Sequence, residues 1–218
     1  MNKKIIIGII LTVLGYVLIM TKFFGIADFG FDKTLTLLTS RIEFWILVIG
    51  IFFFANKVEK NDFLLIKEQK KKWWFYPLSF LALISIITII LNIIVMAEHN
   101  FGIQSNSKIE QQLYDILCAN KGLLIFTCLT AGVTEELLFR GYLLPRIKAL
   151  TNSNVSAVLI SAFLFGIAHY GYGDINRVLF PFIIGIIFGS FYLKYRNISI
   201  LIICHFAMDL YSMYSQCK

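Results

Sequence analysis

The feature that most limits how this chain can fold is a series of long apolar stretches. Seven such stretches occur, at residues 4–21, 42–56, 74–98, 121–148, 154–171, 177–194 and 197–215. Only 15% of the residues are charged, against roughly 25% in soluble domains. Apolar runs of this length are typical of membrane-spanning helices. The sequence therefore predicts an all-α fold, a polytopic transmembrane bundle of about seven helices.

Two of the stretches leave alternatives. The second has only twelve uninterrupted apolar residues from Phe44 to Ala55, about 18 Å of helix against a hydrocarbon core of about 30 Å. It spans the core if the helix begins near Leu35, which takes in Arg41 and Glu43. The first stretch is similar to a secretory signal peptide. Its apolar run is longer and has no small-residue cleavage site, so we interpret it as a transmembrane helix.

Basic residues indicate how the bundle is oriented. Segment 57–74 contains six lysines and ends in two tryptophans, as a cytoplasmic loop followed by an interfacial anchor does. If seven helices alternate, twelve Lys and Arg residues fall on the side of the N-terminus and seven on the other, with Arg140 inside the membrane. The positive-inside rule then predicts a multi-pass cell-membrane protein with a cytoplasmic N-terminus. The abundance of Lys, Ile and Asn favours a bacterial source.

The net charge and the cysteines point to no further site. The charge of +7 is attributed to lysines at one membrane face, and no motif for binding nucleic acid accompanies it. The cysteines show no CxxC spacing, and we predict that they are buried small hydrophobic residues without a disulfide or a metal. They are Cys118, Cys128, Cys204 and Cys217.

Ionisable residues inside the apolar stretches form the candidate site. A charge at the bilayer centre costs at least about 2.5 kcal/mol, so such residues are functional candidates by default. His99, in the polar segment 97–108, is instead predicted to be a solvated loop residue. The candidates are Glu135, Glu136, Arg140, His169, His205 and Asp209.

Helical spacing arranges several of these residues in pairs. His205 and Asp209 are four residues apart and therefore share a helix face. The same spacing joins Glu136 to Arg140. Because Glu135 lies about 100° around the helix from its neighbour, we expect Glu136 to pair with Arg140 while Glu135 faces a cavity.

Helix lengths place four of the candidates at a similar depth. Counted at 1.5 Å per residue from the expected cytoplasmic helix ends, Glu135, His169 and Asp209 lie about 18–22 Å deep. His205 lies at about 12 Å by the same count. Side chains from three helices thus fall within one slab about 10 Å thick, which predicts a single polar cavity inside the bundle.

Two chemistries suit these side chains. A carboxylate and a neutral imidazole can activate a water as general base, while a second imidazole stabilises the oxyanion of an attacked carbonyl. A divalent metal such as zinc, with one open coordination position, is the alternative. Its ligands would be Glu135, His169, His205 and Asp209. Residue spacing does not distinguish the two mechanisms.

Three motifs in this region resemble a known family. EELLFR (135–140) matches Glu-Glu-x-x-x-Arg, FGIAH (165–169) matches Phe-x-x-x-His, and HFAMD (205–209) matches His-x-x-x-Asn/Asp. Their order on successive helices is similar to that in the CPBP family, which comprises CAAX prenyl-protein endopeptidases and bacteriocin-processing enzymes and is also called the Abi domain. The resemblance covers roughly residues 120–213.

The resemblance implies an intramembrane endopeptidase. It implies that Glu135 and His169 activate the water and that His205 and Asp209 stabilise the oxyanion, with the second Glu and the Arg of the first motif in support. Family members are described both as metalloproteases and as metal-independent glutamic proteases, so the metal stays open. The prenyl-protein enzymes carry Asn where this chain has Asp209, which weakens the case for a prenylated substrate.

The sequence thus predicts two regions and one favoured function. Residues 1–119 hold N-terminal transmembrane helices and the lysine-rich loop, and residues 120–218 a CPBP/Abi-like catalytic core. The favoured function is hydrolysis of a peptide or protein substrate at the lipid bilayer. The alternative is a non-enzymatic bacteriocin-immunity or membrane scaffold protein with the same fold. Residues 108–121 form either an amphipathic helix that gates access or a plain connection.

Overall fold

Every described element of secondary structure is helical, as the apolar stretches predict. The computed structural model describes residues 2–25, 32–100, 108–172 and 175–217. The α-helices are α1 (Asn2–Gly25), α2 (Lys33–Phe54), α3 (Phe75–Asn100), α4 (Lys108–Ala119), α5 (Lys121–Glu135), α6 (Leu144–Thr151), α7 (Asn154–Ile167), α8 (Asn176–Tyr195) and α9 (Ile198–Ser215). Two π-helical segments, Ala55–Glu59 and Glu136–Leu143, and a 3-10 turn at Tyr170–Tyr172 accompany them.

Six helical segments are long and apolar enough to cross a membrane. They are Lys3–Thr21, Lys33–Glu59, Phe75–Ala97, Lys121–Thr151, Asn176–Tyr195 and Ile198–Ser215. Their outer faces carry large apolar side chains, and Leu18, Ile46 and Leu81 are 61–66% exposed. Soluble monomers rarely expose contiguous apolar surface on this scale. The chain is therefore a multi-pass membrane protein.

Three sequence predictions change in detail. The second helix begins at Lys33, so the longer of its two predicted forms is the observed one. The span predicted at 154–171 is too long, because α7 ends at Ile167 after 14 residues, about 21 Å of helix. There the chain tightens into a turn in which the His169 amide donates to the Gly166 carbonyl at 3.0 Å. His99 is exposed as predicted but lies in the last turn of α3 rather than in a loop.

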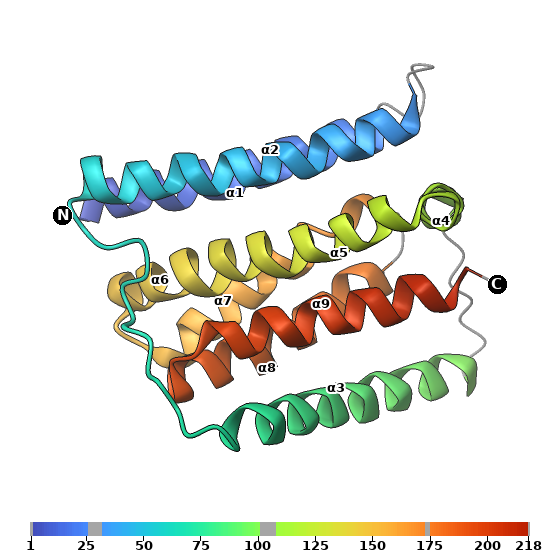
Figure 1. Cartoon of the computed structure of the whole chain (residues 1–218). Coiled ribbons are helices and arrows are strands. Elements are labelled where there is room, and N and C mark those ends of the chain that lie inside the picture. Colours follow the sequence, from blue (N-terminus) through green and yellow to red (C-terminus); the bar gives the residue numbers. More distant parts are fainter. Residues whose placement is uncertain (1, 26–31, 101–107, 173–174, 218) are drawn as a thin grey trace.

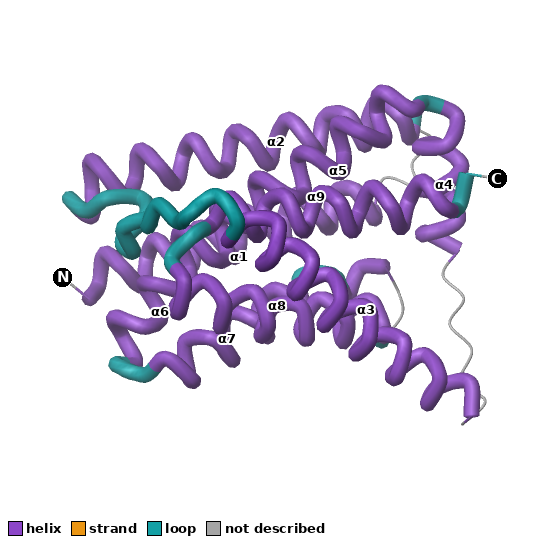
Figure 2. The backbone as a smooth tube through the Cα atoms, turned by 60° about the horizontal axis from the view of Figure 1, so that its bottom comes forward, coloured by secondary structure: helices purple, strands orange, loops and turns teal. Residues whose placement is uncertain are grey.

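The helices stack around a central group that includes α5 and α9 (Figure 1). α1 and α2 lie side by side on one flank, and α2 packs on α5. α3 covers the opposite flank and packs on α8 and α9. α4 lies across one end of the bundle, beside the C-terminus, in both Figure 1 and Figure 2. The N-terminus lies at the other end.

Small residues allow the central helices to approach one another closely. A Cβ at Gly132 of α5 would lie 3.0 Å from the backbone nitrogen of Phe206 in α9. A Cβ at Gly185 of α8 would lie 2.8 Å from Cα of Ala162 in α7. Small residues of this kind replace bulkier packing at helix contacts within membranes. They bring α5 against α9, and α7 against α8, at the level of the candidate site.

The lysine-rich loop is fixed across the end of the bundle that carries the N-terminus. The Arg146 guanidinium donates to Glu59 from Nε (2.8 Å) and Nη2 (2.6 Å), and the Tyr142 hydroxyl donates to the other Glu59 oxygen at 2.6 Å. Farther along the loop, the backbone N–H of Gln69 donates to the backbone carbonyl of Arg196, between α8 and α9, at 2.8 Å. Both charged partners of the Arg146–Glu59 pair are fully buried. Arg146, predicted to be one of the cytoplasmic charges, is therefore part of a buried ion pair.

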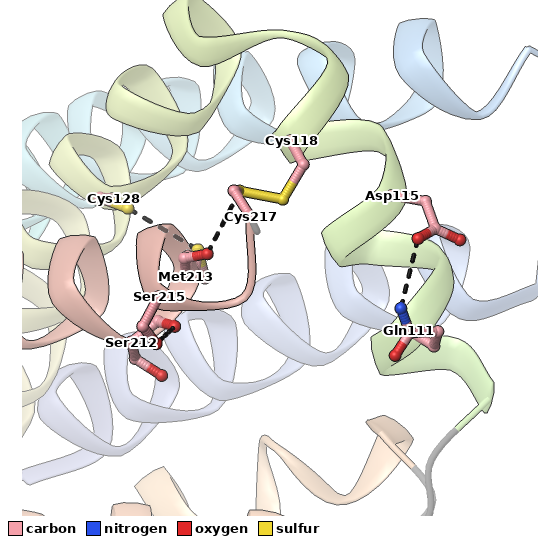
Figure 3. The surroundings of a disulfide bond; sticks show 8 residues. All are labelled: Gln111, Asp115, Cys118, Cys128, Ser212, Met213, Ser215 and Cys217. Atoms are coloured by element: carbon pink, nitrogen blue, oxygen red, sulfur yellow. Dashed lines mark hydrogen bonds between the residues drawn. A yellow bond between two sulfur atoms is a disulfide. The ribbon is translucent and has the colours of Figure 1, made fainter.

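The opposite end of the bundle carries a disulfide, and the prediction of no disulfide is wrong. Cys118, near the end of α4, is bonded to Cys217, which follows α9 (Figure 3). The two cysteines are 99 residues apart, so short-range spacing gave no indication of the bond. Cys128 and Cys204 are free and buried, as predicted. Together with an ion pair from Glu110 to Arg177, the disulfide ties α4 to α8 and to the C-terminal end of α9.

Candidate active site

The structure brings all six candidate residues into one connected cluster. They come from the end of α5 (Glu135), the π-helical segment that follows it (Glu136, Arg140), the turn after α7 (His169) and the middle of α9 (His205, Asp209). Each has at least one ionisable atom within 4 Å of another member. Their common depth, predicted from helix lengths, thus corresponds to a common position in the bundle.

Glu136 forms the predicted pair with Arg140. The Nη1 atom of Arg140 donates to Oε1 of Glu136 at 2.7 Å, and both side chains are buried. The guanidinium also lies over the rings of Phe165 (4.3 Å to the centroid) and Phe188 (5.4 Å). These aromatic faces offset part of the cost of removing the cation from water. Glu136 and Arg140 therefore neutralise each other's charge within the cluster.

His205 is held by the same carboxylate. Its Nδ1 lies 2.8 Å from Oε1 of Glu136. A carboxylate paired with arginine is an acceptor, so Nδ1 carries the proton in this contact. The other ring nitrogen, Nε2, lies 3.6 Å from Oδ2 of Asp209 and 3.8 Å from Oε2 of Glu135. Both distances exceed a hydrogen bond, so Nε2 points into the space between these two carboxylates.

Glu135 has one bonded and one open carboxylate oxygen. Oε1 accepts a hydrogen bond from the hydroxyl of Tyr16 in α1 at 2.9 Å. Oε2 is buried and has no hydrogen-bond partner among the described residues. It lies 3.8 Å from Nε2 of His169 and 3.8 Å from Nε2 of His205. Buried polar atoms are rarely left unbonded, so such an atom marks a place where water or substrate is accommodated.

His169 directs its Nε2 atom toward Glu135, 3.8 Å from Oε2. Its Nδ1 lies 2.8 Å from the carbonyl oxygen of Phe165. Since a carbonyl only accepts, Nδ1 is the donor, and Nε2 of the neutral ring is then an acceptor. The ring also packs edge-on against Phe165, with centroids 4.8 Å apart. Phe165, the first residue of its motif, thus orients the histidine through both its backbone and its ring.

The local fold explains how these groups meet. The helix containing Glu135 changes from α to π geometry at Glu136, and π-helical turns are frequent at functional sites. Ser161, which lies near the site in sequence, donates to the carbonyl of Phe139 in this π segment at 3.3 Å. Its hydroxyl therefore supports the backbone and is not paired with a base. Cys204 is buried beside His205 and is likewise not placed as a nucleophile.

Tyr16 is the site residue that sequence reasoning missed. It lies 119 residues from Glu135 in the chain, inside the aliphatic first helix and outside all three motifs. A single tyrosine in such a helix gives no signal of a polar role. A helical-face analysis would place it toward the bundle, but its partner emerges only from the tertiary structure.

The same side chains are also candidate metal ligands. Glu135, His169 and His205 offer oxygen and nitrogen donors that zinc accepts. Within the described parts of the chain, however, no three His, Cys, Asp or Glu side chains converge on one point as metal ligands do. His205 also has Nδ1 bonded to Glu136. As arranged in the described residues, these side chains do not form a complete metal site.

Comparison with known proteins agrees with the motif analysis. Residues 119–211 match the family model described as "Type II CAAX prenyl endopeptidase Rce1-like". A curated protein of Bacillus subtilis (strain 168), "Putative membrane peptidase YdiL", is 28% identical over 116 residues. That similarity covers 53% of this chain and 46% of the relative, so the chain matches about half of the relative's length. No solved structure matches the chain.

The matched segment contains all three motifs and all six predicted residues, and the predicted family resemblance is confirmed. Tyr16 lies outside it. The predicted boundary between residues 119 and 120 stays a prediction.

Proposed function

We propose that this protein is an intramembrane endopeptidase that hydrolyses a peptide bond with a water activated by Glu135 and His169. One observation carries the proposal. Oε2 of Glu135 is buried, has no hydrogen-bond partner among the described residues, and lies 3.8 Å from Nε2 of His169. Two acceptors at this separation are too far apart to bond directly, but one water can donate a hydrogen bond to each.

The proton transfers follow from this arrangement. The water oxygen attacks the carbonyl carbon of the peptide while one proton passes to Glu135 or His169, which act together as general base. The proton is then delivered to the leaving nitrogen as the C–N bond breaks. His169 Nδ1 keeps its hydrogen bond to Phe165 throughout, which fixes the ring with Nε2 toward the water. Neither step needs a serine or cysteine nucleophile.

His205 is the proposed oxyanion donor. Glu136 holds its Nδ1–H, and a protonated ring surrounded by Glu135, Glu136 and Asp209 would present an Nε2–H donor. Such preorganised donors stabilise charge that develops in the transition state. Asp209 lies four residues farther along α9, where it orients His205 or, if protonated, donates to the oxyanion itself.

The site's surroundings and the comparisons support one class of substrate. The site lies within helices that can span a membrane, so the substrate is a peptide or protein in or at the membrane. The family description and the relative's name both refer to peptidases, which supports hydrolysis rather than the scaffold or immunity alternative. Paired peptides with and without a prenyl group test the lipid requirement, because this chain carries Asp209 where the prenyl-protein enzymes carry Asn.

We also propose that the N-terminus and the lysine-rich loop face the cytoplasm. The lysines of segment 57–74 lie at the same end of the bundle as the N-terminus. The Cys118–Cys217 disulfide lies at the opposite end, beside the C-terminus. Disulfides form in oxidising compartments outside the cytoplasm, and lysines favour the cytoplasmic face. Two independent features thus support the same orientation.

The decisive experiment compares cells that express the wild type with cells that express Glu135→Gln or His169→Ala. Membrane fractions are labelled at free N-termini and analysed by mass spectrometry, which detects cleavage of any membrane protein, whatever its sequence. We expect new N-termini with the wild type and their loss with either variant. Identical profiles for all three proteins, at equal membrane abundance, would contradict the proposal.

The role of a metal is tested on the purified protein. Elemental analysis and activity before and after treatment with a chelator separate the two mechanisms left open by residue spacing. With Glu135 and His169 as the base, activity is expected to survive the chelator. Loss of activity that returns with stoichiometric zinc would replace the proposed water activation by a metal mechanism.

A further inference from the structure

The first helix contributes a side chain to the candidate active site although it lies outside the family match. The Tyr16 hydroxyl donates to Oε1 of Glu135 at 2.9 Å. The tyrosine is only 1% exposed, and the carboxylate is 5% exposed. A hydrogen bond to a charged group in such an environment is stronger than one at the surface.

The tyrosine ring is itself held in place by two other elements. It packs edge-on against Phe139 of the π-helical segment, with ring centroids 5.2 Å apart. It also packs at a tilt against Phe44 of α2, with ring centroids 4.9 Å apart. A large ring fixed on two sides has few alternative rotamers. The position of the hydroxyl is therefore set by α1, α2 and the π-helical segment before any substrate binds.

A carboxylate has two equivalent oxygens, and a bond to one of them decides where the other points. In Glu135 the bonded oxygen faces α1, and the open oxygen faces the two histidines. Glu136 also has one bonded and one open oxygen, but its bonded Oε1 is held by Arg140 and His205, which both belong to the motifs. The orientation of the base thus depends on a hydroxyl from outside the motif region.

We propose that Tyr16 is a positioning residue that holds Glu135 with its open oxygen toward the activated water. The inference rests on the proposed function, and it extends the active site to α1. Residues 119–211 alone would then contain the reacting groups but lack the residue that orients the general base.

The test replaces Tyr16 by phenylalanine, which removes the hydroxyl and keeps the ring. The probes are two fluorescence-quenched CAAX peptides in detergent micelles, one farnesylated and one not, and the wild type and Glu135→Gln are measured alongside. We expect kcat to fall about 10- to 100-fold in Tyr16→Phe, as for the loss of a hydrogen bond to a charged group. KM should stay within about twofold, because the hydroxyl does not contact substrate.

Tyr142 provides a matched control. Its hydroxyl also donates to a buried carboxylate, Glu59, at 2.6 Å, but it does so at the lysine-rich end of the bundle. Tyr142→Phe is expected to lower thermal stability and leave kcat unchanged. If both variants lose kcat in proportion to their stability, the role of Tyr16 is structural and the inference is overturned.

A double variant tests the coupling directly. In Glu135→Asp the carboxylate is one methylene shorter and no longer reaches Tyr16, so adding Tyr16→Phe should cost little more than Glu135→Asp alone. Independent losses that add in full would contradict the inference. A second measurement is infrared difference spectroscopy. Tyr16→Phe should shift one carboxylate band, and the shift should be missing in a Glu135→Gln background.

The outcomes separate this inference from the proposed function. If the wild type cleaves neither peptide, CAAX peptides are not its substrates, and the infrared measurement, which needs no turnover, decides the inference: a carboxylate band that does not shift in Tyr16→Phe overturns it. If the wild type cleaves a peptide, Glu135→Gln does not, and Tyr16→Phe equals the wild type, the proposed function stands and only the inference is overturned.

Discussion

Two adjacent glutamates with opposite environments lie at the centre of the site. Glu136 is fully buried and is bonded through one oxygen to both Arg140 and His205. Glu135 accepts from a single neutral hydroxyl, that of Tyr16. Each glutamate has a buried second oxygen without a hydrogen-bond partner among the described residues, and the one of Glu135 lies 3.8 Å from Nε2 of both His169 and His205. A buried charge is expensive unless it is paired, so the first arrangement suits a structural anion and the second a reactive one. The sequence places the two carboxylates side by side, and in the structure they have different partners.

This contrast predicts that substitutions at the two neighbouring glutamates affect stability to very different extents. Glu136→Gln leaves the Arg140 cation buried without its partner, and should reduce the free energy of unfolding by about 3–5 kcal/mol. Glu135→Gln keeps an acceptor for Tyr16 and should change it by less than about 1 kcal/mol. Unfolding in detergent can be followed with a thiol-reactive dye, since Cys128 and Cys204 are buried and free. Equal midpoints for both variants would contradict the assignment.

Among the individual residues of the site, the sequence predicts the pairs that are close in the chain. It does not predict the pair of Tyr16 and Glu135, which are far apart in the chain. Glu136 with Arg140 and His205 with Asp209 are each four residues apart, and helix geometry alone brings such residues together. The contact of Tyr16 with Glu135 joins residues 119 positions apart and depends on how α1 packs. The contacts of His205 with both glutamates also required the packing of α5 on α9, which spacing does not specify.

Among the elements, two departures from regular helices position the chemistry. The apolar stretch at 121–148 was predicted as one helix, but π geometry from Glu136 to Leu143 interrupts it. α7 ends at Ile167, so His169 lies in the turn that follows the helix and not within the helix, as the stretch 154–171 predicts. Apolar patterns locate helices well, because burial in lipid dictates them. They do not report a change of helical type or an early end, since both depend on tertiary contacts.

The close contact of α5 with α9 gives a prediction at the level of elements. In Gly132→Ala the added Cβ would lie 3.0 Å from the Phe206 nitrogen and 3.2 Å from the Ile202 oxygen, so α9 must move away. Because His205 precedes Phe206, we expect proteolytic activity to fall at least about tenfold while the protein still inserts. Gly50→Ala is the control, since nothing lies within 4 Å of its added Cβ. Wild-type activity in Gly132→Ala would show that the spacing is not critical.

The disulfide gives a second prediction for an element, the transverse helix α4. Cys217→Ser releases a link that closes a loop of 99 residues, and we expect a loss of about 2–4 kcal/mol of stability. Cys118→Ser and the double variant should show the same unfolding midpoint as Cys217→Ser, because each removes the same bond. Cys128→Ser, at a free cysteine, leaves the disulfide intact and serves as the control. A double variant much less stable than either single one would indicate that the cysteines contribute separately.

At the scale of the whole molecule, the two ends of the bundle carry different groups of residues. One end has the N-terminus and a lysine-rich loop fixed by the buried Arg146–Glu59 pair. The other has α4, the disulfide and the C-terminus. Charge bias in the sequence predicted this polarity. The disulfide, which the sequence pattern did not predict, supports it on separate grounds, because it requires an oxidising compartment. The predicted topology places Cys118 and Cys217 on the same, outer side of the membrane. It does not predict that the two cysteines are close together, because that depends on how α4 packs.

The polarity predicts which positions a membrane-impermeant maleimide reaches in intact cells. Lys70 lies in the exposed part of the lysine-rich loop, and Gln111 lies on the exposed face of α4 (Figure 3). Each is replaced in turn by cysteine. With the N-terminus in the cytoplasm, Gln111→Cys should be labelled in intact cells and Lys70→Cys only after the membrane is opened. The native free cysteines are buried and give a low background in the wild type. The reverse pattern would place the disulfide in the cytoplasm, where thiols are kept reduced, and would contradict both features on which the orientation rests.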